Sequence, residues 1–170
     1  MRKNALRTKR ITFLALFTSL ALVLSYVEFL IPLPQGIPGI KMGLPNIVIL
    51  LILYRLGIKE AAIISLIRIL LVTLTVSPRL DYLWYSLAGA TLSLVTMWML
   101  KNLDVFSTVG VSVAGAIMHN LGQVIVSIFL FETTQLAYYM IVLSITGTVA
   151  GVFIGLCGAL MHKRLEKIKM

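Results

Sequence analysis

The stretch SVAGAIMHNLGQVIVSIF, residues 112–129, decides in which solvent this chain folds. Nearly every residue in it is apolar or small, yet His119, Asn120 and Gln123 lie in its middle. With its apolar neighbours the stretch reaches the length of about 20 residues that a helix needs to cross a bilayer. Lipid offers no hydrogen bonds, so these three side chains need partners inside the protein or in a ligand.

The composition of the whole chain also favours lipid as the solvent. Of its 170 residues 59% are hydrophobic and 12% are charged, whereas about a quarter of a soluble domain is charged. The net charge is +9, and the basic residues cluster in MRKNALRTKR (1–10) and HKRLEKIK (162–169). Clusters at the ends of apolar blocks favour an anionic membrane surface over nucleic acid. The single cysteine, Cys157, excludes an intrachain disulfide and a cysteine-rich metal site.

We predict an all-α integral membrane protein, a single transmembrane domain over residues 1–170 built as a compact bundle of six transmembrane helices. The helices are expected at residues 11–31, 45–57, 59–76, 82–100, 108–131 and 136–161. The second is short, so either it tilts or the Pro/Gly-rich stretch before it enters the membrane. No small-residue cleavage site follows the first apolar run, which we expect to be retained.

The distribution of Lys and Arg predicts the orientation of the bundle. Six crossings place both termini on one side, together with Arg55, Lys59 and Lys101. Only Lys41 and Arg79 fall on the other side. Because positive charge prefers the cytoplasm, we expect both termini to be cytoplasmic.

Arg68 lies inside the third apolar segment, nine residues beyond Lys59 and therefore roughly 14 Å deep. A charge near the bilayer centre costs at least about 2.5–3.5 kcal/mol, so Arg68 must face the bundle interior and have a partner. One interpretation is a structural bond to a helix carbonyl or to Glu28. The other is a cation that faces an anionic or carbonyl-bearing ligand.

His119, Asn120 and Gln123 share one helical face, since they are spaced by three and four residues. They act either as hydrogen-bonding links between packed helices or, together with Arg68, as the lining of one binding pocket. Further candidate substrate-binding residues fall on the outer side by the charge count. These are Glu28, Lys41, Asn46 and Tyr85. The stretch PLPQGIPGIKMGLPN is long and apolar, and we expect it to fold over the helices as a lid.

Small residues mark faces on which helices approach closely. The sixth segment carries Gly147, Gly151 and Gly155, and the first carries Ala15 and Ser19. Each face packs either inside the bundle or against a partner membrane protein, and the residues alone leave both alternatives open. We treat all five as candidate partner-binding residues.

The chain shows no phosphate-binding loop, dinucleotide fingerprint or zinc-protease motif. We therefore expect no catalytic residues, no cofactor and no metal in this chain. Any ATP used in transport must be bound by another chain.

Three stretches carry a resemblance to a known family over nearly the full chain. They are GIKMGLPNIVILLILYRLGIKEAAIISLIRILL, SLAGATLSLVTM and GVSVAGAIMHNLGQVIV. They resemble the Gx transporter family, also described as heptaprenyl diphosphate synthase component I. In layout that family is similar to the substrate-binding S components of energy-coupling factor (ECF) transporters.

This resemblance implies a subunit of the prokaryotic inner or plasma membrane that captures a small vitamin-like or isoprenoid-like substrate. It also implies a transmembrane coupling subunit and ATPase subunits as partners. S components present a small-residue motif to the coupling subunit, and Ala15 and Ser19 match that motif only loosely. Two alternatives stay open: an accessory membrane subunit of an isoprenoid or quinone biosynthetic enzyme, and a gradient-driven carrier that works alone. Few intramembrane acids are present to support the carrier.

Overall fold

The chain folds as a bundle of helices, as the sequence predicts. A computed structural model describes residues 2–30, 43–76, 80–132 and 134–165. Within these residues it contains six α-helices and one 3₁₀ turn, and no strand. They are α1 (Arg2–Leu30), α2 (Asn46–Arg55), α3 (Ile58–Thr75), α4 (Leu80–Asn102), α5 (Thr108–Phe131), η1 (Thr134–Tyr138) and α6 (Tyr139–Leu165).

Most helix bounds lie within a few residues of the predicted ones, and the exceptions are at the two ends. Helix α1 begins at Arg2, so the basic N-terminal stretch is helical rather than an extension outside the helix. Helix α6 begins at Tyr139 because η1 occupies the residues before it. Between α2 and α3 the chain turns at Gly57, whose φ of 108° disfavours other residue types.

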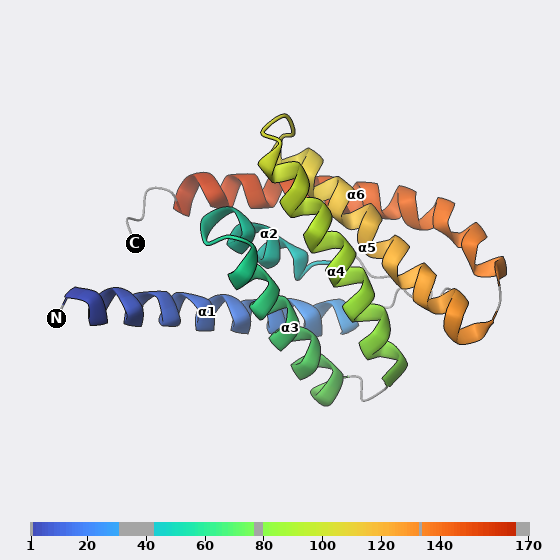
Figure 1. Ribbon diagram of the computed structural model, residues 1–170, viewed down its shortest axis with the longest axis horizontal. Coiled ribbons are helices and arrows are strands. Elements are labelled where there is room, and N and C mark those ends of the chain that lie inside the picture. The colour runs from blue at the N-terminus through green and yellow to red at the C-terminus, as the bar shows by residue number, and fades with distance from the viewer. Residues whose placement is uncertain (1, 31–42, 77–79, 133, 166–170) are drawn as a thin grey trace.

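The helices alternate in direction along the chain. Figure 1 shows the odd-numbered helices running one way and the even-numbered helices the other. As a result, the N-terminal end of α1 and the C-terminal end of α6 lie at the same end of the bundle. Helix α5 packs between α4 and α6, α3 packs against α1 and α4, and α2 packs against α3 and α6.

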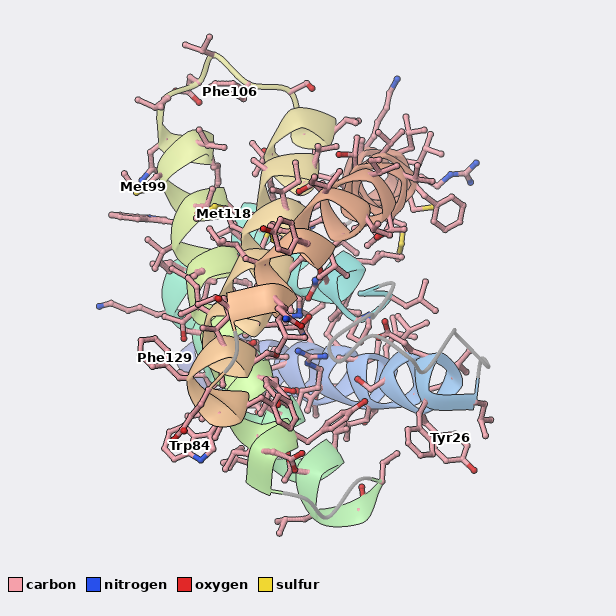
Figure 2. The ribbon with its side chains drawn as sticks, turned by 90° about the vertical axis from the view of Figure 1, so that its right-hand side faces the viewer. Tyr26, Trp84, Met99, Phe106, Met118 and Phe129 are labelled. Atoms are coloured by element: carbon pink, nitrogen blue, oxygen red, sulfur yellow. The ribbon has the colours of Figure 1, made fainter. Side chains whose placement is uncertain are left out.

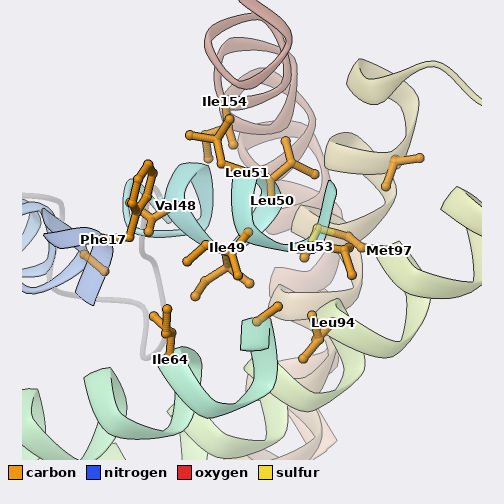
Figure 3. Close-up of a cluster of buried hydrophobic side chains, with 14 residues drawn as sticks. Phe17, Val48, Ile49, Leu50, Leu51, Leu53, Ile64, Leu94, Met97 and Ile154 are labelled. Carbon is orange, nitrogen blue, oxygen red and sulfur yellow. The ribbon is translucent and has the colours of Figure 1, made fainter. Parts of the chain in front are cut away.

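The short helix α2 forms the centre of the hydrophobic core. Every residue from Val48 to Leu53 is at most 3% exposed, and Figure 3 shows their side chains meeting Phe17, Ile64, Leu94 and Ile154 from four other helices. A helix that is apolar all round belongs in a protein interior. Its ten residues span about 15 Å, half of the hydrocarbon thickness of about 30 Å. Helix α2 is therefore too short to cross the bilayer by itself and lies inside the bundle.

Both ends of α2 find hydrogen-bonding partners within the bundle. At the C-terminal end, Lys101 Nζ of α4 donates to the Leu53 carbonyl at 2.7 Å and lies 5.1 Å from the centre of the Tyr54 ring. At the N-terminal end, the Asn46 N–H donates to the Gly43 carbonyl at 2.8 Å. A helix that stops inside the protein needs such partners for its terminal groups.

The outer surface of the bundle is apolar. On α3 the exposed large side chains are Ile63, Leu66, Ile67, Leu70, Leu71 and Leu74. In Figure 2 the side chains of Tyr26, Trp84 and Phe129 point outward, and each is more than half exposed. An apolar surface of this extent fits contact with lipid.

Among the described residues, four helices are long and apolar enough to cross a membrane. They are Arg10–Leu30, Asp81–Asn102, Thr108–Phe131 and Met140–Arg164. The sequence predicted six crossings. Helix α2 is too short by itself, and α3 carries three charged side chains. The four spans fit a membrane protein, with α2 and α3 completing the bundle.

Candidate functional site

An ionic cluster forms where α1 meets α3, made of Ser25, Glu28 and Arg68. Arg68 lies on the same face of α3 as the buried residues Ala61, Ile64 and Ser65, which turns it toward the bundle. Its Nη1 donates to Ser25 Oγ at 3.5 Å, and the Glu28 carboxylate attracts its charge. The Ser25 and Glu28 side chains are 7% and 8% exposed.

The Arg68 guanidinium keeps unused hydrogen-bonding capacity. It carries five N–H donors, and among the described residues its hydrogen bond is the long one to Ser25. Its Nε is buried and has no hydrogen-bond partner in the described part of the chain, while the side chain as a whole is partly exposed. The arrangement can therefore donate further hydrogen bonds to a molecule placed against α3.

Glu28 connects the ionic cluster to the beginning of α2. Its Oε1 accepts a hydrogen bond from the Gly43 N–H at 2.5 Å. Gly43 has a φ of 73°, which favours glycine, and a Cβ there would lie 2.9 Å from Asn46 Nδ2. The Glu28 carboxylate thus holds the turn from which α2 starts. Asn46 closes that turn, because its N–H donates to the carbonyl of Gly43.

The polar residues of α5 face two different neighbours. His119 packs against Gly89 of α4, where a Cβ would lie 2.9 Å from the His119 carbonyl oxygen and 3.0 Å from its ring. Asn120 Nδ2 donates to the Leu143 carbonyl of α6 at 2.7 Å. A Cβ on Gly147 would lie 2.7 Å from the same Nδ2. Asn120 is therefore a hydrogen-bonding link between helices, and Gly147 makes room for it.

Among the described residues, Gln123 is a buried polar side chain whose hydrogen-bonding groups are both unsatisfied. It is fully buried, and neither Oε1 nor Nε2 has a hydrogen-bond partner among the described residues. Its position on α5 lies between the face that meets α4 and the face that meets α6. An unpartnered buried amide costs about 1–3 kcal/mol, so Gln123 is a candidate to form hydrogen bonds with a ligand inside the bundle.

The described hydrogen bonds do not join Arg68 to the α5 residues. The guanidinium bonds to α1, whereas Asn120 bonds to α6. A single pocket lined by Arg68 and the α5 residues therefore stays a prediction. Tyr85 is 6% exposed and lies inside the bundle rather than at an open mouth. Lys41 and most of the expected lid lie outside the described residues.

The two candidate partner faces have different surroundings. Ala15 and Ser19 are exposed on α1, and the Ser19 hydroxyl donates to the Ala15 carbonyl at 3.0 Å. The glycine face of α6 is occupied within the chain. A Cβ on Gly151 or Gly155 would lie 2.7 Å from a Cα atom of α5. Of the two alternatives for Gly147, Gly151 and Gly155, packing inside the bundle fits these contacts with α5. Their contact with a partner stays a prediction.

Sequence analysis missed Ser25 and the Gly43 N–H. Ser25 precedes Glu28 by three residues, so the two share a helical face inside an apolar segment. That spacing is a signal from which Ser25 is predictable. The Gly43 contact joins backbone to side chain across the fold, and residue types do not reveal such a contact.

Comparison with known proteins places the chain in a family. No match was found among curated proteins or among solved structures. The family model described as heptaprenyl diphosphate synthase component I matches residues 17–161, which include all the described polar residues of α1, α3 and α5 discussed above. The chain belongs to the heptaprenyl diphosphate synthase component I family.

Proposed function

We propose that this chain is a substrate-binding membrane subunit, similar to the S components of ECF-type uptake transporters. It binds a small vitamin-like or isoprenoid-like metabolite. In this proposal it lies in a prokaryotic plasma membrane with both termini in the cytoplasm. It works with a transmembrane coupling subunit and ATPase subunits, since the sequence carries no nucleotide-binding motif.

The observation that carries the proposal is the Arg68 guanidinium with its unused donors. A charged side chain inside a membrane bundle is expensive and usually marks a ligand or ion path. Glu28 offsets the charge, but among the described residues one 3.5 Å hydrogen bond uses only one of the five donors. A ligand oxygen placed at Arg68 would accept hydrogen bonds from one or two of the remaining donors.

The short helix α2 supports a site at this place. In membrane transporters, helices that stop inside the bilayer often have ligands at their ends. The N-terminal end of α2 is tied through Gly43 to Glu28, and Glu28 acts on Arg68. A site that includes Arg68 therefore lies beside a helix terminus within the bundle.

A double-mutant cycle separates binding from stability. Arg68→Gln removes the positive charge that attracts the buried Glu28 carboxylate, and this loss is expected to lower the stability. Adding Glu28→Gln removes the carboxylate charge as well, so the double variant is expected to recover part of the stability. We expect the double variant to fold. If Arg68 binds the ligand, the double variant retains no small molecule in native mass spectrometry. Retention equal to that of the unsubstituted protein would refute the role of Arg68.

A second candidate is an accessory membrane subunit of an isoprenoid or quinone biosynthetic enzyme, which the description of the matched family favours. Prenyl-chain elongation requires carboxylate clusters that hold Mg²⁺ and diphosphate. The aspartates of this chain, Asp81 and Asp104, lie far apart in the sequence. In this role the chain assists a catalytic partner.

Affinity purification from native membranes distinguishes the two candidates. Co-purification of ATPases with a transmembrane coupling protein supports the binding subunit. Co-purification of a soluble prenyl synthase, with a changed product length when the chain is deleted, supports the accessory subunit and contradicts the first proposal.

A further inference from the structure

The Gln123 side chain is a hydrogen-bonding group that the packed bundle leaves unused. It is completely buried, and neither Oε1 nor Nε2 has a hydrogen-bond partner among the described residues. Two neighbouring polar side chains of α5 are bonded within the bundle. Asn120 donates to the Leu143 carbonyl, and the Ser127 hydroxyl donates to the backbone carbonyl of Gln123. Gln123 differs from both in that the acceptor and the donor of its amide stay available.

Helix α5 is held so closely on two sides that it cannot turn to find a partner for this amide. Toward α4, a Cβ on Gly122 would lie 2.7 Å from the Ala88 carbonyl oxygen. Toward α6, a Cβ on Gly151 would lie 2.7 Å from the Val113 Cα atom. Such close contacts between backbones fix the rotation of α5, because no side chain stands between the helices to adapt. The polar atoms of Gln123 therefore change direction by rotation of its own side-chain bonds.

Helices α4, α5 and α6, which pack side by side, carry no charged side chain in their apolar segments. Residues 82–100, 108–131 and 139–161 contain no Asp, Glu, Lys or Arg. An ionised group placed between these helices would have no counter-charge from them, and burial of such a group is strongly unfavourable. A ligand group that meets Gln123 is therefore recognised by hydrogen bonds rather than by charge.

We propose that Gln123 binds a polar group of the ligand in which an N–H donor lies beside a C=O acceptor, as in an amide, lactam or imide. The inference rests on the proposed binding function and names its substrate class. A glutamine amide has an oxygen acceptor and an N–H donor, so such a group bonds to both at once. An ester, a ketone or an ionised carboxylate only accepts, and it would leave Oε1 of Gln123 buried without a donor. Sites that are built to bond a polar ligand group reject analogues without it for this reason.

The test compares two probes that share one aromatic ring, benzamide and methyl benzoate, of which only the amide has an N–H donor. The full-length protein is held in nanodiscs, and binding at millimolar probe concentrations is measured by saturation-transfer NMR. Empty nanodiscs correct for partition of each probe into lipid. We expect the amide to bind at least about tenfold more tightly than the ester, because the ester leaves a buried acceptor unsatisfied. Any molecule that co-purifies with the protein is expected to contain an N–H beside a C=O, which its fragmentation in native mass spectrometry identifies.

Substituting Gln123 should abolish the preference for the amide. Gln123→Met removes both hydrogen-bonding groups and keeps a side chain of similar length and flexibility. The ratio of benzamide to methyl benzoate binding is expected to fall by at least about tenfold. The matched control is Gln135→Met, which makes the same change at an exposed position of η1 and should leave the ratio unchanged.

Each outcome decides between the inference and the proposal beneath it. Equal binding of the two probes to the unsubstituted protein, or a co-purified molecule without an N–H beside a C=O, would overturn the ligand class and leave the binding function intact. Binding of neither probe, with no co-purified molecule, would overturn the binding function itself. An unchanged ratio in a folded Gln123→Met protein would overturn the assignment of the ligand group to Gln123. The probe pair on the unsubstituted protein gives its result even if the variant fails to fold.

Discussion

Replacing Gln123 with methionine is expected to make the protein more stable. The amide is completely buried, and neither of its polar atoms has a hydrogen-bond partner among the described residues. Methionine has a similar length and flexibility and no group that requires a hydrogen bond. Removing an unsatisfied buried amide should raise the free energy of unfolding by about 1–3 kcal/mol. Steric trapping in bicelles measures that free energy directly in a lipid environment.

The matched control is Asn120→Ala, three residues away on the same helix. Asn120 donates a 2.7 Å hydrogen bond to the Leu143 carbonyl of α6, and hydrogen bonds of this kind contribute about 0.6–1.7 kcal/mol in membrane bundles. The two substitutions should therefore change stability with opposite signs. If Gln123→Met destabilised the protein as much as Asn120→Ala, the amide would have a partner in the membrane and the reasoning would be refuted.

Three further substitutions test the packing and the charges of the bundle. Gly151→Leu should prevent folding or separate α5 from α6, because a Cβ at this position would lie 2.7 Å from the Val113 Cα atom. The control Gly110→Ala should be tolerated, because the atom nearest to its added Cβ lies at 3.6 Å. The folded yield in size-exclusion chromatography measures both effects. Lys101→Met should lower the free energy of unfolding by about 1.5–3 kcal/mol, because the ammonium group donates to the Leu53 carbonyl at the C-terminal end of α2. Steric trapping measures this loss. An unchanged free energy of unfolding would show that water replaces the ammonium group. Glu60→Gln should change that free energy by less than about 1 kcal/mol because the ion-pair partner of Glu60 is 57% exposed; a larger change would indicate a buried pair.

The helical architecture was predictable from the sequence because lipid imposes a simple rule on it. Apolar segments of sufficient length must be helices, since backbone groups in lipid have to bond within their own segment. The predicted segment 108–131 coincides with α5. Orientation relative to the cytoplasm rests on the positions of Lys and Arg and stays a prediction.

The role of α2 was not predictable from residue types alone. A short apolar run is compatible with a tilted span, with a re-entrant stretch or with a buried core helix, because periodicity does not separate them. The structure shows that α2 is surrounded by other helices and that Lys101 bonds to its C-terminal end. That lysine precedes a loop in the sequence, and nothing there indicates its contact with Leu53.

The candidate site was predictable as a set of residues but not as a set of contacts. Arg68, Gln123 and Glu28 stood out because each is a polar group in an apolar segment. Their partners depend on how the helices rotate against one another. The contact partner of Gly151 was equally unpredictable. The spacing of small residues shows that a helix packs closely there, but not whether that helix belongs to this chain or to another.

The central claim is that the polar interior of this bundle holds a small molecule through Arg68. The most direct measurement is native mass spectrometry of the mildly solubilised full-length protein beside the Arg68→Gln, Glu28→Gln double variant. The account predicts one additional mass of metabolite size on the unsubstituted protein, absent from the folded double variant. The same additional mass on both proteins, or none on either across a broad metabolite screen, would contradict it.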